Sequence, residues 1–459
     1  MAKETVTDSL PTASFTETVA FLFKVMAPNI AKGVIIRRPA VVHLAEQWAL
    51  DTRSIKQVQA FNSKYGKGPL LFNTPFKPMA LILDPDDAHR VMEETPEPFA
   101  TAESAKRSAL SHFEPDMALV SHGKAREERR RLNEDVLQSG CPVHGFSRHF
   151  MQVIEEEVAA LLEVVEQHNH KLDWPLFIDA WNRIVRRVVL GDSARDDHEL
   201  TQTLIRLRRA ANWGFMHPKR KRVRQSFYEQ LAHYVDRAEP NSLAALVAGH
   251  DADSQARPLQ QMPQWLFAFE PAGMATFRAL ALICAHPEQA KRAQAEANQA
   301  ATPKPDTTFL KACVLEALRL WPTTPLLLRE TTERTRWTQG EMPRNTTLLI
   351  HAPYFHRDDR HLEIAHRFAP DTWLSPGSLD DWPLLPFSGG PGICPGRHLV
   401  LMVTSAVLAA LLKERHIRLD PPDRLSGTQP MPALLSNFHL CFQVTKASGL
   451  AEQEATSRL

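Results

Sequence analysis

The sequence has no excess of charge of either sign and few cysteines. Its 54 Lys and Arg residues balance 53 Asp and Glu residues, leaving a formal charge of +1. Bulk charge therefore indicates neither nucleic acid nor an acidic membrane as a partner. The five cysteines lie far apart along the chain, which argues against a disulfide framework and against structural zinc. A reducing compartment fits this usage, and we expect a cytoplasmic protein. The cysteines are Cys141, Cys284, Cys313, Cys394 and Cys441.

Long uninterrupted apolar runs are also missing near the N-terminus. The stretch 18–36 is broken by Lys24, Pro28, Asn29 and Lys32, so it falls short of the roughly 20 apolar residues that span a bilayer. We predict neither a membrane anchor nor a signal peptide. No repeat or long polar linker divides the 459 residues. We therefore predict one domain over 1–459, with an N-terminal extension of about 1–35 and a C-terminal tail over 446–459.

Hydrophobic periodicity predicts a mainly α protein with a minor β region. Apolar residues recur at helical spacing over several long stretches, and alternation of β-branched and polar residues favours strands in two shorter ones. Basic residues between His217 and Arg224 read as a solvated turn between helices. The predicted helices are 150–167, 176–190, 262–285, 288–300, 309–320 and 397–413, and the predicted β segments are 78–83 and 326–350.

The most informative motif is a glycine-rich loop, 387–396, which places Cys394 just before a long helix. Glycines let a backbone fold tightly around a sulfur atom. Backbone N–H groups and the positive end of the helix dipole lower the pKa of a thiol. Both features suit a thiolate that binds a metal, although a lone cysteine in such a loop is as often a buried structural residue.

A second motif lies upstream, where Glu316 and Arg319 are three residues apart and share one helix face. Such pairs are common on protein surfaces and contribute little there. Arg367 follows before the cysteine loop and is a candidate to complete a buried charge-assisted network with them.

These motifs, in this order, resemble the cytochrome P450 family over about residues 40–445. The resemblance implies a cytochrome P450-like fold with haem b held between the 262–285 helix and the cysteine loop. Cys394 would be the thiolate ligand of the iron, which favours O–O cleavage. Phe387, Gly390 and Gly396 would shape its loop, while Glu316, Arg319 and Arg367 would hold the core beneath.

The resemblance also implies cationic partners for the two haem propionates. Arg130 matches the family's arginine, Arg126 replaces the usual aromatic or His residue, and Arg329 matches an arginine in the first strand after the Glu-x-x-Arg helix. The position two before the cysteine is often Arg or His in the family but is Gly392 here. Either one propionate contact is missing or Arg126 replaces it.

The helix that would activate oxygen departs most from the family pattern. Without a gap, Ala268, Glu270 and Pro271 fall on the small, acidic and threonine positions, so the acid is kept and the alcohol is lost. A four-residue shift instead keeps the hydroxyl of Thr276 and loses the acid. We favour the ungapped alignment.

In the ungapped alignment, Pro271 frees the carbonyl of Phe267 for a water molecule. We expect Pro271 and Gly273 to kink the helix and open a groove for oxygen, with Glu270 controlling proton delivery. An incidental kink, with Glu270 facing solvent, is the plainer alternative.

The resemblance implies an apolar pocket above the haem and therefore a hydrophobic substrate. A roof over this pocket would come from Trp213, Phe215 and Met216. The residues expected to line the pocket are Phe267, Phe269, Thr323, Thr324, Leu326 and Leu327.

The function that these motifs imply is a monooxygenase acting on an apolar small molecule with O2. The sequence contains no flavin or nicotinamide fingerprint and no iron–sulfur cysteine spacing. A ferredoxin-like or flavin-containing protein would then supply electrons, docking near Cys394 on residues such as Arg397, Lys413 and Arg415. Two alternatives are open: a peroxide-driven oxidase or rearrangement enzyme, and a non-catalytic haem-binding sensor.

Overall fold

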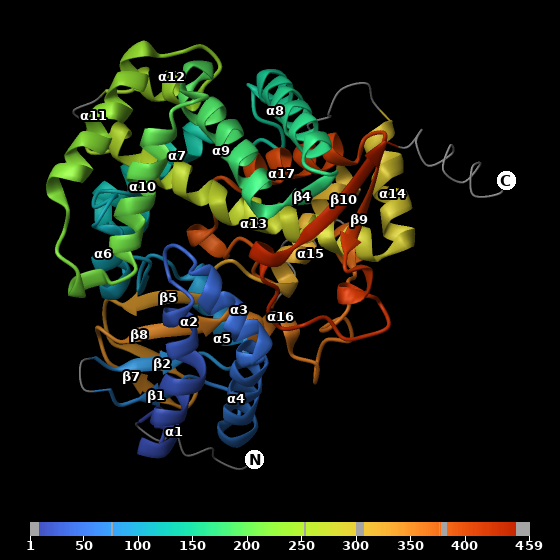
Figure 1. Cartoon of the computed structure of the whole chain (residues 1–459). Helices are drawn as coiled ribbons and strands as arrows, with labels where there is room; N and C mark the ends of the chain where they lie inside the picture. The colour runs from blue at the N-terminus through green and yellow to red at the C-terminus, as the bar shows by residue number, and fades with distance from the viewer. Residues whose placement is uncertain are drawn as a thin grey trace.

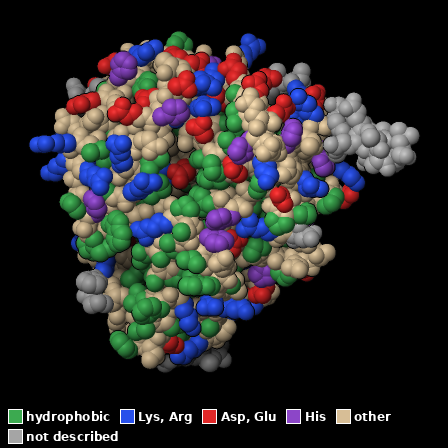
Figure 2. Space-filling model, viewed as in Figure 1, with side chains coloured by type: hydrophobic (Ala, Val, Ile, Leu, Met, Phe, Trp, Pro, Cys, Tyr) green, Lys and Arg blue, Asp and Glu red, His purple; other side chains and the backbone are tan. Residues whose placement is uncertain are grey.

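The computed structural model describes residues 9–74, 77–251, 254–299, 307–375, 377 and 383–446. Helices dominate the upper part of the molecule and a twisted sheet with the N-terminal helices forms the lower part (Figure 1). Charged side chains of both signs are mixed over the face shown in Figure 2, so this face has no single-sign field. The balanced composition thus extends to this surface.

The α-helices have the following bounds: α1 Phe15–Phe21, α2 Ala27–Ala31, α3 Pro39–Gln47, α4 Leu50–Tyr65, α5 Pro85–Glu93, α6 Ser104–Leu110, α7 Gly123–Val136, α8 Ser147–Gln167, α9 Trp174–Leu190, α10 His198–Ala211, α11 Lys221–Arg237, α12 Leu243–Ala248, α13 Met262–Ala285, α14 Pro287–Asn298, α15 Thr308–Leu320, α16 Ala352–Arg357 and α17 Arg397–Leu412. The strands are β1 Leu70–Phe72, β2 Met79–Leu81, β3 Phe99–Ala100, β4 Lys171–Asp173, β5 Leu326–Thr331, β6 Thr335–Trp337, β7 Gly340–Met342, β8 Thr347–His351, β9 Arg415–Asp420 and β10 Cys441–Lys446.

The helical core is built around α13, which packs against α9, α15 and α17. Every residue of α13 from Ala272 to Ile283 is buried, because this half of the helix is apolar on all sides apart from Thr276 and Arg278. Among the described residues, only the stretch 258–285 is long and apolar enough to cross a membrane, and 78% of its apolar window is buried inside the protein. A helix in the core of a globular protein is buried to a similar degree and passes the same test.

Close packing of α13 on α9 depends on Gly273. A Cβ atom at this position would lie 2.9 Å from Nε1 of Trp181, and that Nε1 donates a 2.8 Å hydrogen bond to the carbonyl of Phe269. The indole therefore occupies the notch that the glycine leaves. The predicted oxygen groove at Gly273 is wrong, because Trp181 fills this side of the helix.

The sheet region has its own hydrophobic core. Its five-stranded sheet has the order β1-β2-β8-β5-β3, in which only the β2–β8 pairing is parallel. The N-terminal segment packs on this sheet, with Phe21 of α1 stacked on Phe72 of β1 at 4.2 Å between ring centroids. The described part of the predicted N-terminal extension is thus folded onto the sheet. A second sheet, β4-β10-β9, lies beside α8 and α9.

Most predicted elements are confirmed within a few residues of their bounds. The predicted helix 262–285 is α13, the 397–413 helix is α17, and the 78–83 strand contains β2. The basic turn is wrong in part, because α11 begins at Lys221 and includes Arg222 and Arg224. Of the predicted C-terminal tail, only Lys446 is described, as the last residue of β10, and 447–459 lie outside the described residues.

Replacing Gly273 with alanine is expected to destabilise the protein by about 1–3 kcal/mol, because the new Cβ collides with the rigid indole of Trp181. Thermal unfolding followed by circular dichroism measures this loss. Gly140→Ala is the matched control, since nothing lies within 4 Å of its added Cβ. Equal melting temperatures for the two variants would contradict the packing described.

Candidate functional site: a cysteine loop beneath the central helix

The cysteine loop is held by its own backbone and by α7. The amide of Cys394 donates to the carbonyl of Phe387 at 2.9 Å, which closes the loop. Gly390 has φ +55°, and a Cβ atom there would lie 2.2 Å from the carbonyl oxygen of Met92, so only glycine fits. Arg130 of α7 donates to the carbonyl of Ile393 at 2.6 Å. The position of the sulfur is thus fixed from three directions.

The surroundings of Cys394 differ from the sequence expectation in one respect. Burial raises the pKa of the Cys394 thiol, against the smaller lowering effects of the Gly396 N–H, Arg130 and Arg397. The helix-terminus effect that the sequence suggested is present but is outweighed by burial. A buried thiol becomes a thiolate when it binds a metal cation.

The missing side chain at Gly392 leaves space that Arg329 occupies. Nη2 of Arg329 lies 2.9 Å from the Cβ position of Gly392, and it donates to Ser388 Oγ at 3.2 Å. Arg329 is 3% exposed, and its Nε donates to Thr95 Oγ1 at 3.1 Å. A guanidinium from β5 therefore stands where the family usually has a cation in the loop itself.

Two further cations gather on the same side of the loop. Arg126 is buried, with a single long contact of 3.5 Å to the carbonyl of Pro391. Lys106 of α6 donates to the carbonyls of Thr101 and Leu328 at 2.8 and 3.1 Å. Burial, with repulsion from Arg329, lowers the pKa of Lys106 to about 7. Within the described residues, no ion pair to a carboxylate is formed by Arg126, Arg329 or Lys106.

This cationic cluster is the arrangement that two buried carboxylates of a ligand would neutralise. Arg126 and Arg329 were predicted to be near the site, and the structure brings them together. Arg130, the third predicted cation, is instead paired with Glu134 at 2.5 Å and with the cysteine loop. Lys106 was missed, because one lysine on a short polar helix carries no sequence signal.

The Glu316–Arg319 pair is completely buried and bidentate. Nε and Nη2 of Arg319 donate to the two oxygens of Glu316 at 2.7 and 2.6 Å, and both side chains are 0% exposed. Glu316 also accepts from Nε1 of Trp373 and from the amide of Ala369, at 2.9 and 2.8 Å. Every charge in the pair is therefore hydrogen-bonded, as buried ions require.

The predicted third member, Arg367, contributes only its backbone. Its carbonyl accepts from Nη2 of Arg319 at 2.8 Å, while its side chain is exposed and contacts the carbonyl of Glu363. The side-chain prediction is wrong because the chain turns with this carbonyl facing inward. His356 joins the network instead, accepting from the Leu385 amide at 2.8 Å. Burial, with repulsion from Arg319, lowers the pKa of His356 to about 3.

On the other side of the core, α13 is partly open around Pro271. Phe267, Ala268, Glu270 and Pro271 are half-buried, whereas the next turns are fully buried. Arg208 of α10 forms an ion pair with Glu270 through Nη1. Its guanidinium also lies over the ring of Phe267, 4.8 Å from the centroid. Glu270 is thus held by an arginine, and the alternative in which it faces bulk solvent is wrong.

A second carboxyl, missed from the sequence, is buried next to this pair. Glu114 is 0% exposed, and burial raises its pKa well above the usual range, opposed by Arg208. The amide nitrogen of Gln264 donates to both Glu114 oxygens, at 2.7 and 3.0 Å. The neighbouring Phe113 packs edge-on against Phe267, with centroids 5.6 Å apart. A polar cluster therefore stands among the apolar residues of this region.

Four of the remaining predicted pocket residues lie at or just before the start of β5. Leu326 and Leu327 are half-buried at the start of β5, and Thr323 and Thr324 lie just before it. Thr324 is exposed.

Two residues of α13 point into the core. Phe269 is 3% exposed and packs on Trp181. The Thr276 hydroxyl is 0% exposed and donates to the carbonyl of Ala272 at 2.9 Å within its own helix.

The predicted roof residues are on the outer surface. Trp213, Phe215 and Met216 are 51%, 85% and 66% exposed, and Trp213 stacks on the guanidinium of Arg38. The prediction that they cover a pocket is wrong. They follow α10 in a short turn whose side chains face outward, and helical spacing alone does not determine this direction.

Comparison with known proteins agrees with this geometry. A family model described as cytochrome P450 matches residues 268–437, which include α13 from Ala268 onward, the Glu316–Arg319 pair and the cysteine loop. Two solved structures share the fold at low sequence identity. A zebra fish cytochrome P450 with progesterone has a TM-score of 0.67 at 16% identity, covering 85% of this chain and 99% of that one. A cytochrome P450 from Thermus thermophilus has a TM-score of 0.61 at 21% identity, covering 80% and 91%.

Curated relatives match over shorter stretches. A steroid 21-hydroxylase from Lynx lynx is 32% identical over 179 residues, covering 36% of this chain and 35% of that protein. A chloroplastic carotene epsilon-monooxygenase from Arabidopsis thaliana is 27% identical over 210 residues, covering 42% and 39%. The chain thus matches little more than a third of the length of these relatives. The family model and the shared fold together show that this chain belongs to the cytochrome P450 family.

Replacing Glu316 with glutamine is expected to cost about 3–5 kcal/mol of stability, because it leaves the buried guanidinium of Arg319 uncompensated. Thermal or urea unfolding measures the loss. Glu288→Gln is the matched control: it breaks a pair of the same three-residue spacing, with Lys291, whose side chains are about three-quarters exposed, and should change stability by less than about 1 kcal/mol. Similar losses in both variants would refute the structural role assigned to the buried pair.

If Arg329 receives a haem propionate, as the resemblance implies, replacing it with glutamine is expected to weaken haem retention about tenfold or more, because a buried charge-assisted contact would be lost. The rate of haem transfer to excess apomyoglobin measures retention without any turnover. Arg367→Gln, which removes an exposed arginine of the same charge, should leave that rate unchanged. An unchanged rate in the Arg329 variant would show that its guanidinium serves the loop alone.

Proposed function

We propose that this protein is a haem-thiolate monooxygenase that oxidises an apolar small molecule with O2 and electrons from a separate protein. The observation that carries this proposal is the combination of Cys394 with a buried cluster of Arg126, Arg329 and Lys106. A thiol alone would suit several metals. A thiol beside cations without carboxylate partners, in this family, suits iron protoporphyrin with its two propionates.

The residues present fit haem b. Cys394 would hold the iron, Arg126 and Arg329 would receive the propionates, and Lys106 is placed to assist them. Gly390 keeps the loop close to Met92, so the sulfur stays at a fixed depth. When bound, a thiolate-ligated haem supplies oxygen activation, because the sulfur donates electron density that favours O–O cleavage.

Glu270 is the residue we propose for proton handling. Its Oε2 is paired with Arg208, and it lies on the half-buried turn of α13 next to Pro271. Pro271 has no N–H, so the carbonyl of Phe267 lacks its helical donor and is able to hold a water molecule. A carboxylate and a hydrated carbonyl within one turn provide a route for protons where the family usually uses a threonine. Thr276 is less suited, because its hydroxyl is committed to the Ala272 carbonyl.

The residues near the open part of α13 support a substrate that is mostly apolar and carries one polar group. Phe267, Leu326 and Leu327 offer apolar surface, while Glu114 and Gln264 offer one buried polar contact. The curated relatives are named for a steroid and for a carotene, both of which are largely hydrocarbon. These names support an apolar substrate but not one of the two in particular.

An external electron donor, ferredoxin-like or flavin-containing, is part of the proposal. Arg397 is the best-placed of the proposed docking residues, because it follows the cysteine loop and acts on Cys394 electrostatically. Lys413 and Arg415 share a surface groove with Glu155, Glu163, Glu166 and Glu414, so that surface is mixed in charge. We also propose a reducing, cytoplasmic location, since all five cysteines are unpaired.

Peroxide-driven oxidation is the second candidate, and one observation favours it. Proline replaces the threonine position, and Glu270 is tied to Arg208, so proton delivery to bound oxygen is more constrained than in the usual arrangement.

Replacing Cys394 with serine is expected to abolish the strongly red-shifted Soret band of the dithionite-reduced, carbon monoxide-bound protein, because the band requires a thiolate ligand. Absorption spectra of both proteins measure this. Cys141→Ser, which changes an exposed cysteine, should keep the wild-type band. A wild-type band typical of histidine-ligated haem would overturn the proposal. With the band established, equal turnover with peroxide alone and with an electron donor would favour the second candidate.

A further inference from the structure

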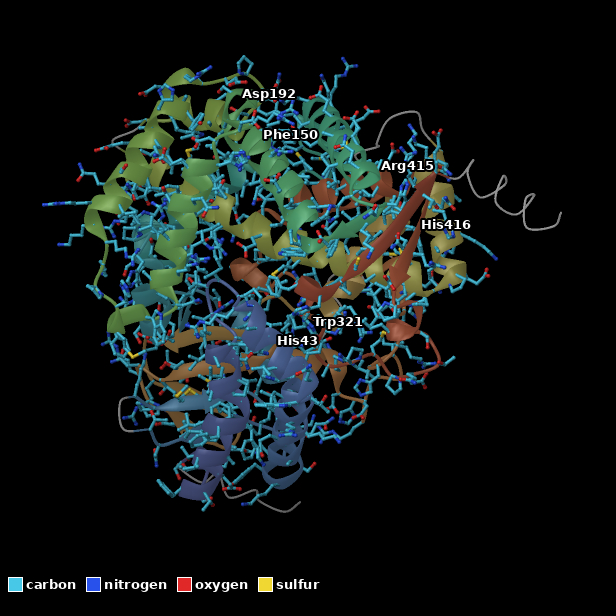
Figure 3. All side chains as sticks on the ribbon, in the orientation of Figure 1. His43, Phe150, Asp192, Trp321, Arg415 and His416 are labelled. Carbon is cyan, nitrogen blue, oxygen red and sulfur yellow. The ribbon has the colours of Figure 1, made fainter. Side chains whose placement is uncertain are left out.

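A small polar cavity lies at the junction of the helical and sheet parts. Trp321, one of its walls, is labelled in Figure 3 near the centre of the molecule, where the two parts meet. The other walls come from the N-terminal segment at 32–37, from α3, α4, α13 and α16, from the 322–325 segment and from the loop containing Leu434. Segments far apart in the sequence therefore face one space.

The cations that line this cavity outnumber the acids. Lys32, Arg37 and Arg278 are cationic, and Asp51 is the only acid among the lining residues. Lys32 and Asp51 are 4% and 7% exposed, and both carboxylate oxygens of Asp51 lie 2.7–2.8 Å from Nζ of Lys32. Asp51 is therefore committed to Lys32, and two guanidinium groups remain on the cavity wall.

The carboxylates that attract these two arginines from outside the cavity are already paired with other cations. Glu46 attracts Arg278, and Glu270 attracts Arg37. Glu46 lies 2.9 Å from Nη2 of Arg424, and Glu270 is held by the arginine of α10 described above. Within the described ranges, neither Arg37 nor Arg278 forms an ion pair with a carboxylate. The walls and their surroundings thus keep an excess of positive charge.

Arg278 also has a hydrogen-bond donor that the described residues leave unused. It is 4% exposed and donates to the carbonyls of Trp321 and Leu435 at 3.3 and 2.7 Å, while its buried Nε has no partner among these residues. Arg37, which is half-buried, donates to two further carbonyls, both at 2.8 Å. Carbonyl contacts satisfy hydrogen bonds but do not neutralise charge. Burial, with repulsion from Arg37, lowers the pKa of Arg278 to about 9, so the group stays cationic near neutral pH.

The size of the cavity restricts what is able to supply the missing negative charge. Its volume is about 30 Å³, against the roughly 10–15 Å³ that one water-sized group needs. A monatomic ion fits, alone or with one water molecule, whereas sulfate, phosphate and organic acids are too large. Val42, Met274 and Leu434 add apolar surface to the walls. Such surface suits a weakly hydrated ion such as chloride better than strongly hydrated fluoride, because less hydration is lost on burial.

We infer that this cavity binds one halide ion, chloride under physiological conditions, and that the ion fastens the N-terminal segment to α13. Arg37 belongs to the N-terminal segment and Arg278 to α13, so an anion between them attracts both. A water molecule would satisfy donors but leave the charge of both guanidinium groups uncompensated. The inference does not depend on the proposed function, because neither arginine has been assigned a part in haem binding or proton handling.

Thermal unfolding of the haem-loaded protein at constant ionic strength tests the inference. Sodium chloride replaces sodium gluconate, whose anion is too large for the cavity. A ligand that binds only the folded protein raises Tm as its concentration exceeds its Kd, and we expect a rise of at least about 2 °C between about 1 and 200 mM chloride. The Soret band should stay in place, because the ion binds away from the iron. An unchanged Tm, or a chloride-dependent Soret shift that accounts for the rise, would overturn the inference.

Two variants locate the effect. Arg278→Gln and Arg37→Gln should each remove the dependence of Tm on chloride. Arg292→Gln is the matched control, since Arg292 pairs with Asp371 on the surface, and it should keep the dependence. If Arg278→Gln fails to fold, Arg37→Gln still decides. An equal chloride effect in all the proteins would be a general salt effect, which overturns the inference.

Crystals soaked in sodium bromide give the position of the ion, because bromide scatters X-rays anomalously. We expect an anomalous peak between the guanidinium groups of Arg37 and Arg278, and no such peak in Arg37→Gln crystals. Bromide found only elsewhere would overturn the assignment of the site. A peak in the cavity without any effect of chloride on Tm would show occupancy at crystal concentration only, and the fastening role would then be wrong.

Discussion

The buried pair of Glu316 and Arg319 is the interaction on which the rest of this structure depends. Two opposite charges without any exposure are tolerable only if every donor and acceptor is used, and here the network meets that condition. Arg319 binds carbonyls of the 356–367 segment, and Glu316 holds the amide of Ala369 and the indole of Trp373. His356 then carries the same network to Leu385, just ahead of the cysteine loop. An irregular stretch of chain thus gains a defined path to Cys394.

The cationic cluster shows how the fold uses the space left by a missing side chain. Gly392 has no side chain, yet its space is filled by a guanidinium from β5, a strand more than 60 residues earlier. Arg329 is the arginine that the resemblance already places in this strand, so its guanidinium adds no cation beyond those expected. The loop position itself contributes no charge, and the space left by its side chain lets Arg329 approach the loop closely. Charge placement, and not residue position, is what a buried anionic ligand senses.

Much of the fold was predictable from the sequence, and the part that was not has physical causes. The helices α13 and α17 were predictable, because a helix that is buried on nearly all sides is apolar along most of its length. The β4-β10-β9 sheet was missed, since β4 has only three residues and pairs with β10 more than 260 residues later in the chain. In the site, Cys394, Arg126 and Arg329 were predictable because motifs fix their spacing. Lys106, Glu114 and the inward carbonyl of Arg367 were not, because only tertiary contacts bring them to the site.

The Arg208 side chain has a mechanical consequence for this protein. The guanidinium of Arg208 contacts Glu270 and the ring of Phe267, both on α13, and the carbonyl of Ile35. It therefore links α10, α13 and the N-terminal segment. Asn212, at the end of the same helix, holds the backbone of Ile35 and Ile36. An outward shift of α10 would therefore release the N-terminal segment and free the Glu270 carboxylate in the same movement. The position of the N-terminal segment and the pairing of the Glu270 carboxylate thus depend on the same helix.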